Sequence, residues 1–180
     1  MHHATAGLAA LLLALPFAAP RAAVAQVGYR EVADTSFGGV HLTLRSNDKN
    51  EVELVATHGG LLGATVLVDA DSLERWLDSV RTIARVPAPA DLRDQLRFDG
   101  PYVQGRNERA GLQSELGFVR TIGGQSSTLV VSAWDVEYAP NTTLPVEMML
   151  SRAEFDSFIA LVQDAIATAK ELTKKAPART

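Results

Sequence analysis

The chain has 180 residues, no Cys, and 17 Lys and Arg against 21 Asp and Glu, for a formal net charge of −4. The acidic balance argues against nucleic acid binding, because phosphate contacts draw on clustered Lys and Arg. The one basic cluster, Lys170 to Arg179, complements the dipole at a helix end and continues into a basic C-terminal tail from about residue 173. Without Cys there are no disulfides, thiolate metal sites or lipidated N-terminal Cys.

The first 25 residues have the pattern of a cleavable export signal. Residues 6–15 are Ala, Gly and Leu only, and the small-x-small triplet Ala23-Val24-Ala25 follows at cleavage distance. We therefore predict cleavage after Ala25, a mature chain that starts at Gln26, and a secreted or periplasmic location. The apolar run is shorter than the roughly 20 residues that cross a bilayer, so we expect no stable membrane insertion after cleavage. Because the n-region lacks Lys and Arg, an uncleaved, membrane-retained form is the alternative.

The remaining chain, residues 26–180, is expected to form a single exported, soluble globular domain, and it begins with alternating segments typical of half-buried strands. These segments are residues 40–45, 51–57 and 64–68, separated by the turn formers of 46–50 and by His58-Gly59-Gly60. The first two predict a hairpin that places Arg45 opposite Glu51 and Leu42 opposite Leu54. We therefore expect a three-stranded antiparallel meander in the first half.

The apolar period changes to that of a helix after residue 68. Over residues 69–85 the apolar side chains recur at helical spacing: Leu73, Trp76, Leu77, Val80 and Ile83. Asp69 stands where an N-cap is expected, and Pro87 and Pro89 cannot continue a hydrogen-bonded turn. This pattern predicts an amphipathic helix that lies on the sheet.

The second half is predicted to hold further strands and a longer helix. The expected strands are residues 96–98, 116–121, 128–134 and 145–150, with a polar loop over 100–109. Ser151 and Glu154 form a capping box ahead of the apolar stripe Phe155, Phe158, Ile159, Val162 and Ile166. The predicted fold class is therefore α+β, with a mainly antiparallel sheet of six or seven strands and two amphipathic helices packed on one face. A curled or barrel-like sheet is the main variant.

Two pairs of segments suggest an internal repeat. Residues 55–60 resemble 119–124, and residues 73–77 resemble 155–159. The two offsets are 64 and 82, so a second copy would contain 18 extra residues, about the length of one added hairpin. Both a true repeat and chance similarity between strand-turn-strand segments are compatible with this pattern.

Neither nucleophilic hydrolysis nor metal binding is supported by a complete motif. His58-Gly59-Gly60 resembles the oxyanion loop of esterases, but residues 124–128 lack the second Gly of a nucleophile elbow. The mature chain offers only His41 and His58 as imidazole ligands. A zinc site that adds Glu51 or Glu53 is less favoured than two solvent-facing His side chains.

Paired carboxylates are the remaining catalytic candidates. Asp69 and Asp71 could bind a cation or divide acid and base roles, but both are also typical of a helix N-terminus. Asp48 has the oxygen-rich neighbours that calcium prefers, without the ligand spacing of an EF-hand loop. Asn141-Thr142-Thr143 is a glycosylation sequon that matters only in a eukaryotic source. We therefore predict no catalytic, cofactor-binding or metal-binding residues and no cofactor.

The few aromatic residues divide into core and surface candidates. Trp76, Phe155 and Phe158 fall on inward helix faces, where burial explains them. The freer aromatic residues, which sugar or peptide sites could use, are Tyr102, Trp134 and Tyr138. We expect an exported domain that binds a small ligand or a cell-envelope or extracellular protein partner without catalysis. The alternative is a carboxylate-dependent hydrolase, which clustered carboxylates in a pocket would favour.

Overall fold

The computed structural model describes residues 28–60, 62–87, 96–109, 111–123, 126–135 and 145–176. The predicted signal with its cleavage site at Ala25, the sequon at Asn141 and Tyr138 lie outside these residues. The strands are β1 (Arg30–Phe37), β2 (Val40–Ser46), β3 (Glu51–His58), β4 (Leu62–Asp69), β5 (Leu96–Asn107), β6 (Leu112–Gly123), β7 (Ser126–Asp135) and β8 (Val146–Leu150), and the helices are α1 (Ala70–Ala84) and α2 (Arg152–Lys175). All eight described strands form one open sheet, in the order of the sequence.

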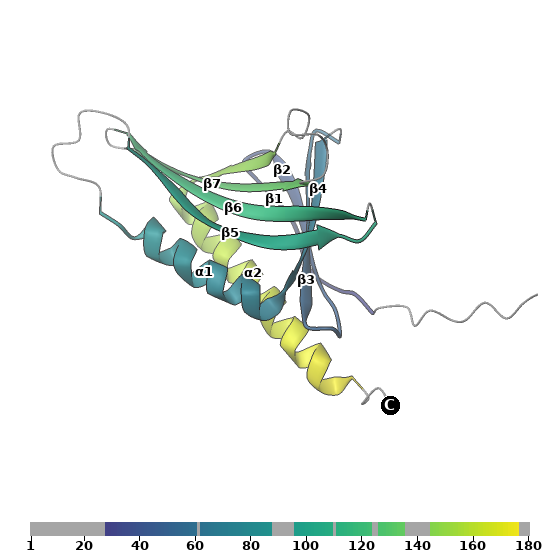
Figure 1. Ribbon diagram of the computed structural model, residues 1–180. Helices are drawn as coiled ribbons and strands as arrows, with labels where there is room; N and C mark the ends of the chain where they lie inside the picture. Colours follow the sequence, from purple (N-terminus) through teal and green to yellow (C-terminus); the bar gives the residue numbers. More distant parts are fainter. Residues whose placement is uncertain are drawn as a thin grey trace, which may run out of the picture.

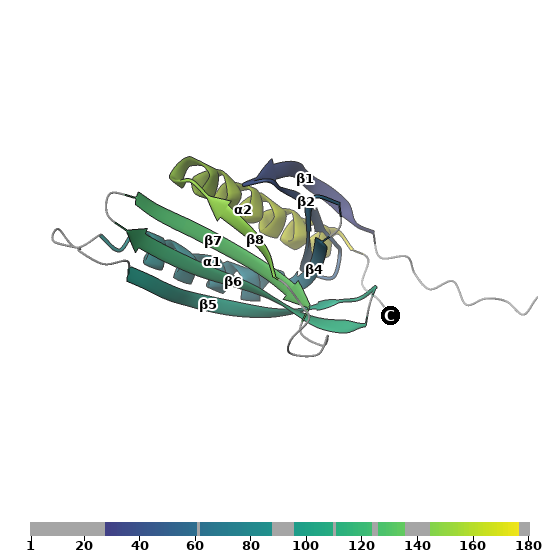
Figure 2. The same cartoon turned by 90° about the horizontal axis from the view of Figure 1, so that it is seen from above.

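The architecture confirms the α+β class, the antiparallel sheet and the two helices on one face. Figures 1 and 2 show α1 and α2 side by side on the same side of the strands. Every neighbouring pair of described strands is antiparallel. The sheet has eight strands where six or seven were expected, because the N-terminal strand β1 was not predicted.

The two halves of the chain share one order of elements, and each helix packs mainly on the other half. Among the described elements, β1 to β4 precede α1, and β5 to β8 lie between α1 and α2. Among the strands, α1 makes its densest contacts with β5, whereas α2 makes its densest contacts with β2 and β1. One apolar core cluster contains residues of both halves. This exchange of helices ties the halves together.

The similar sequence segments do not mark equivalent strands of the two halves. Residues 55–60 end the third strand of the first half, whereas residues 119–123 end the second strand of the second half. Among the described residues no hairpin is added in the second half, since each half has four described strands. The order of elements repeats, but the alignment suggested by the sequence is displaced by one strand.

The register of the β2–β3 hairpin differs from the expected one by two residues. Arg45 lies opposite Glu53, where Glu51 was predicted. Leu54 lies opposite Leu44, so its predicted pairing with Leu42 was also wrong. The side chain of Asn47 accepts backbone hydrogen bonds from Lys49 and Glu51, and the Asn47 N–H donates to the Glu51 carbonyl. These contacts close the loop between residues 47 and 51. An even shift leaves every side chain on its predicted face.

Strand β1 lacks a clean alternation because it lies at the edge of the sheet and contains a bulge. Its register shifts between Glu31 and Ala33. Val32 and Ala33, which are adjacent in sequence, are both packed against the core. A bulged edge strand need not follow the period of two, so the sequence pattern did not reveal it.

The predicted polar loop over residues 100–109 was wrong, because most of it belongs to the twelve-residue strand β5. Two positions of β5 are glycines because the backbone of a neighbouring strand lies close to them. A Cβ at Gly100 would lie 2.5 Å from the Phe118 carbonyl oxygen, and one at Gly105 would lie 2.6 Å from that of Leu67. Gly100 and Pro101 lie at the register shift of β5 between Asp99 and Tyr102, so they mark a bulge and close contacts rather than a loop.

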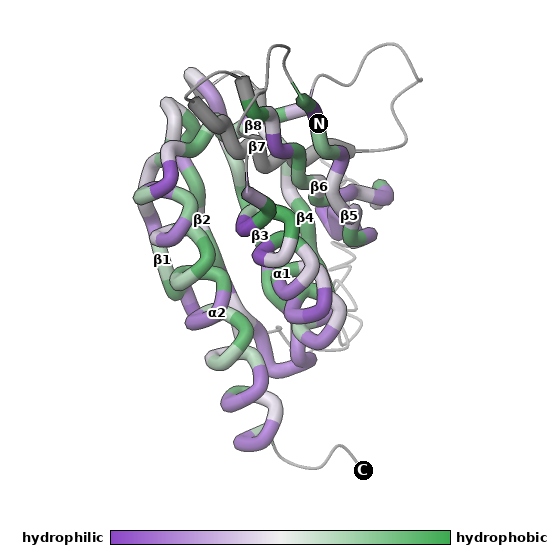
Figure 3. The backbone as a smooth tube through the Cα atoms, turned by 90° about the vertical axis from the view of Figure 1, so that its left-hand side faces the viewer, coloured by the Kyte–Doolittle hydropathy of each residue, from purple (hydrophilic) through white to green (hydrophobic). Residues whose placement is uncertain are grey.

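Both helix starts were predicted correctly. The Asp69 side chain accepts hydrogen bonds from the backbone N–H groups of Asp71 and Ser72. Ser151 and Glu154 form the complete capping box. Figure 3 shows apolar and polar residues alternating around both helices, and the five predicted stripe residues of α2 are all buried.

Candidate functional site

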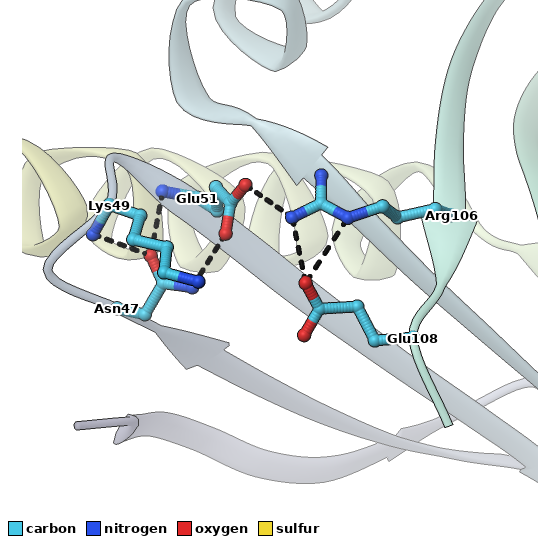
Figure 4. A network of polar contacts seen from close by, with 5 residues as sticks. All are labelled: Asn47, Lys49, Glu51, Arg106 and Glu108. Carbon is cyan, nitrogen blue, oxygen red and sulfur yellow. Dashed lines mark hydrogen bonds and ion pairs between the residues drawn. The ribbon is translucent and has the colours of Figure 1, made fainter. Parts of the chain in front are cut away.

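A polar network joins the β2–β3 loop to β5 where the two halves of the sheet meet. Buried Asn47 donates from Nδ2 to Glu51 Oε2 at 2.8 Å, and Arg106 Nη2 donates to Glu51 Oε1 at 2.6 Å. Arg106 also donates from Nε and Nη2 to Glu108 Oε1 (Figure 4). The network fixes the guanidinium of Arg106 beside the only bridge between β4 and β5 that the structure describes, Leu67 with Arg106.

The electrostatics of this junction keep Arg106 charged and Tyr29 neutral. The hydrogen bond with Glu51, with a further one from Glu108, raises the pKa of Arg106 above its ordinary value despite partial burial. Burial raises the pKa of the Tyr29 phenol, although a hydrogen bond with Asn47 opposes the change. Two nitrogens of Arg106 are held by carboxylates, whereas Nη1 makes no hydrogen bond among the described residues.

An open cleft of about 480 Å³ lies beside this junction. It is lined by Leu67, Asp69, Gln104, Gly105, Arg106, Gln113, Ser114 and Glu115. The Ser114 hydroxyl is fully buried and has no hydrogen-bond partner in the described part of the chain. An unpaired buried hydroxyl is costly, and this one is shielded from the open cleft.

A second open cleft, of about 420 Å³, continues along the same strand. Its lining residues are Ser72, Arg75, Trp76, Ser79, Pro101, Tyr102, Val103 and Gln104. Trp76 is buried, and its Nε1 donates to the Pro101 carbonyl at 2.9 Å, so the indole forms a fixed wall. Tyr102 is 58% exposed and lies at the rim of this cleft.

The two clefts share Gln104, and together they form what we call the β5 groove. Its first wall is the start of α1, from Asp69 to Ser79, and its second is β5 from Pro101 to Arg106. Over most of its length β5 pairs only with β6, because the described pairing with β4 is limited to Arg106. Pro101 and a register shift between Asp99 and Tyr102 blunt this edge against another strand.

The structure does not assemble the metal and nucleophile candidates of the sequence. Exposed His41 pairs with Asp34 at 2.9 Å and lies opposite Thr57, while Glu53 lies opposite Arg45 near the other end of β3. His58 is exposed at its turn. Within the described residues, no three His, Asp or Glu side chains form a group that could hold a metal ion.

The paired carboxylates serve the structure. Asp69 caps α1, and Asp71 accepts from Asn50 at 3.3 Å and pairs with Lys170 at 3.1 Å. In the β2–β3 loop, the residue whose side chain receives the backbone N–H groups is Asn47, next to the predicted calcium candidate Asp48.

The polar members of the β5 groove were missed because their segment was taken for a loop. Gln104 and Arg106 have exposed side chains on a strand, and Ser114 follows on β6. Three groove residues were singled out from the sequence: Tyr102 as a surface aromatic, Asp69 as a carboxylate or helix cap, and Trp76 as a core residue. Trp134 lies on β7, and its side chain is outside what the structure describes.

No family model matches the chain, and no curated protein does. Among the described helices, none combines the length and apolar character that a membrane span requires. The candidate site is therefore interpreted from its own geometry.

Proposed function

We propose that this protein is an exported, non-catalytic binding protein, and that its ligand occupies the β5 groove. The observation that carries the proposal is the presence of two open clefts that share Gln104, with the exposed ring of Tyr102 in one and the amides of Gln104 and Gln113 in the other. The pattern of residues 1–25 supports export, since an apolar run followed by Ala23-Val24-Ala25 is typical of a cleaved signal.

The lining of the groove favours an uncharged ligand with several hydroxyl groups. Arg106 is the one cation of the first cleft, and Asp69 and Glu115 are its anions, so no strong charge of either sign selects an ion. Amides of Gln104 and Gln113 offer both donors and acceptors. A neutral saccharide matches this mixture, since its ring can lie on Tyr102 while its hydroxyls pair with the amides.

The carboxylates of the groove favour binding over hydrolysis. Asp69 accepts two backbone N–H groups as the cap of α1, so it is committed to the helix. Glu51, just outside the groove, is held by Asn47 and Arg106. A carboxylate-dependent glycosidase needs two carboxyl groups directed at one bond. Of the two carboxylates that line the groove, Asp69 is committed to the helix, so Glu115 would have to act without it.

Binding of neutral oligosaccharides tests the proposal. We expect titration calorimetry of the purified protein with a panel of neutral oligosaccharides to detect at least one that binds. Tyr102→Ala should weaken that binding at least about tenfold, equivalent to about 1.4 kcal/mol, with no change in melting temperature. Met149→Ala is the matched control, because Met149 is also 58% exposed but lies on β8, outside the groove.

Two results would contradict the proposal. If no neutral oligosaccharide binds, the ligand class is wrong. If one binds equally well to Tyr102→Ala and to the unmodified protein, the site is elsewhere. Cleavage of the bound oligosaccharide, seen by mass spectrometry, would replace the binding protein with the hydrolase alternative.

A further inference from the structure

Four arginine side chains lie near one another where α1 ends and α2 begins. Arg81 belongs to α1, Arg85 is the C-cap of that helix, Arg120 belongs to β6 and Arg152 to α2. A cleft of about 210 Å³ is lined by Arg81, Arg85 and Arg152 together with Asp156 and the apolar side chains of Phe155 and Ile159. Arginine presents several donors in a fixed plane, which suits oxyanions.

Arg120 places a buried positive charge behind this cleft. It is 7% exposed, and its Nη1 donates to the Ile83 carbonyl at 2.8 Å and to the Val86 carbonyl. Its Nε is buried and has no partner among the described residues. Burial, and then the charge of Arg152, lower the pKa of Arg120. The carbonyls at the end of α1 stabilise the guanidinium only in part, since a helix end carries about half a charge.

The described carboxylates do not balance these cations. Asp78 pairs with Arg81 at 3.3 Å, and Asp156 pairs with Arg152 at 3.4 Å. Arg152 also donates from Nη1 to the Ala84 carbonyl at 3.2 Å, which turns it toward α1. Four guanidinium groups thus face two carboxylates, and the Arg85 side chain makes no ion pair with any described residue.

We propose that this cleft binds the phosphate group of a small anionic ligand, with Arg85 and Arg152 as its direct contacts. A bound phosphate relieves the repulsion between Arg152 and Arg120 and supplies a partner for Arg85. The apolar wall of Phe155 and Ile159 leaves room for an organic group attached to the phosphate.

Calorimetric titration with inorganic phosphate and with glycerol 3-phosphate, at constant ionic strength, tests this site. We expect both to bind with one-to-one stoichiometry, and Arg85→Gln to weaken both at least about tenfold. Arg85 makes no described side-chain contact, so the variant should fold normally and keep its melting temperature. Arg97→Gln is the matched control, because Arg97 is an exposed arginine paired with Asp99 on β5.

The outcomes separate the ligand sources and the two proposals. Tighter binding of glycerol 3-phosphate assigns the site to a phosphate monoester, and equal binding assigns it to free phosphate. Absence of binding by both, or an unchanged affinity in Arg85→Gln, would overturn the site. Tyr102→Ala should leave phosphate binding unchanged, so this result is independent of the β5 groove.

Discussion

The two halves of the sheet have the same order of elements but different strands and different surfaces. The strands of the first half have seven or eight residues, whereas β5 and β6 have twelve each. In the first half, even outward-facing Glu53 and Leu67 are buried. In the second half, the outer face exposes Tyr102 and Met149, and the edge of β5 carries the groove.

This difference indicates a division of roles between the halves. The first half is covered by α2 on one face and by charged side chains such as Arg45 on the other, so it acts as a scaffold. In the second half, β5 extends past its described pairing with β4 at Arg106, and the β5 groove lies beside it. Two halves with the same order of elements can thus have different roles, one in stability and one in binding. The predictions below test this comparison.

The largest effect is expected at Phe158, where α2 joins the first half. Phe158 is fully buried and meets Phe37 of β1 edge to face, with ring centroids 6.2 Å apart. Phe158→Ala should lower the free energy of unfolding by about 3 to 5 kcal/mol in denaturant titrations. Asp164→Ala, on the exposed face of the same helix, should change it little. An unaltered stability in Phe158→Ala would mean that α2 is not part of the core.

The junction of the halves is tested at Gly105. Its added methyl group would collide with the Leu67 carbonyl of β4, whereas one at Gly63 would meet only ordinary contacts, at 3.5 Å and beyond. We expect Gly105→Ala to cost about 1 to 3 kcal/mol. Gly63→Ala should leave the stability nearly unchanged, and thermal unfolding of both variants measures the difference. Equal stabilities of the two variants would contradict the close approach of β4 and β5.

A smaller effect is expected at the start of α2. The Ser151 hydroxyl accepts the Glu154 N–H at 3.3 Å, and Glu154 accepts the Ser151 N–H at 2.8 Å. Ser151→Ala should therefore cost about 1 kcal/mol. Ser157→Ala is the control, because the Ser157 hydroxyl donates a hydrogen bond to the Ala153 carbonyl of the same helix and does not cap its N-terminus. A loss as large in Ser157→Ala would show that the capping box is not the cause.

The same capping box predicts a dependence on pH. Hydrogen bonds from Ser151, and one from the Gly38 backbone, hold the pKa of Glu154 below its ordinary value of 4.5. A depressed carboxyl pKa stabilises the fold above the ordinary value, and this contribution is lost as pH falls through the lowered pKa. The melting temperatures of Glu154→Gln and the unmodified protein should converge below about pH 4.5. A constant difference down to pH 2 would contradict the coupling.

Reductant and chelator are expected to leave the melting temperature unchanged. The chain lacks Cys, and its described residues contain no group suited to a metal ion. We therefore expect the melting temperature to be the same with or without reductant and with or without chelator. A chelator-induced drop of several degrees, which corresponds to about 1 kcal/mol for this size, would restore a metal site at His41 or Asp48.

Local rules predicted the elements whose residues act on their own neighbours. The helix starts at Asp69 and Ser151 follow from capping within four residues, and the apolar stripe of α2 follows from its period. What failed depended on contacts distant in sequence. Gly100 and Gly105 suggest a loop until Phe118 and Leu67 are seen against them.

The candidate site was beyond prediction for the same reason. Tyr102 could be identified by its residue type, since exposed aromatics are unusual. Gln104, Arg106 and Ser114 became candidates only when β4, β5 and the start of α1 were placed together. Ordinary polar residues carry no motif, so geometry alone selects them.

The central claim is that the second half binds the ligand while the first half supports it. The most direct test is an NMR titration of the isotope-labelled protein with the neutral oligosaccharide that binds in calorimetry. We predict that the amide signals of residues 102–106 and 72–79 shift on binding. The amide signals of β2 and β3 should change little. Shifts centred on Arg45 and Glu53 would place the ligand on the first half and contradict the account.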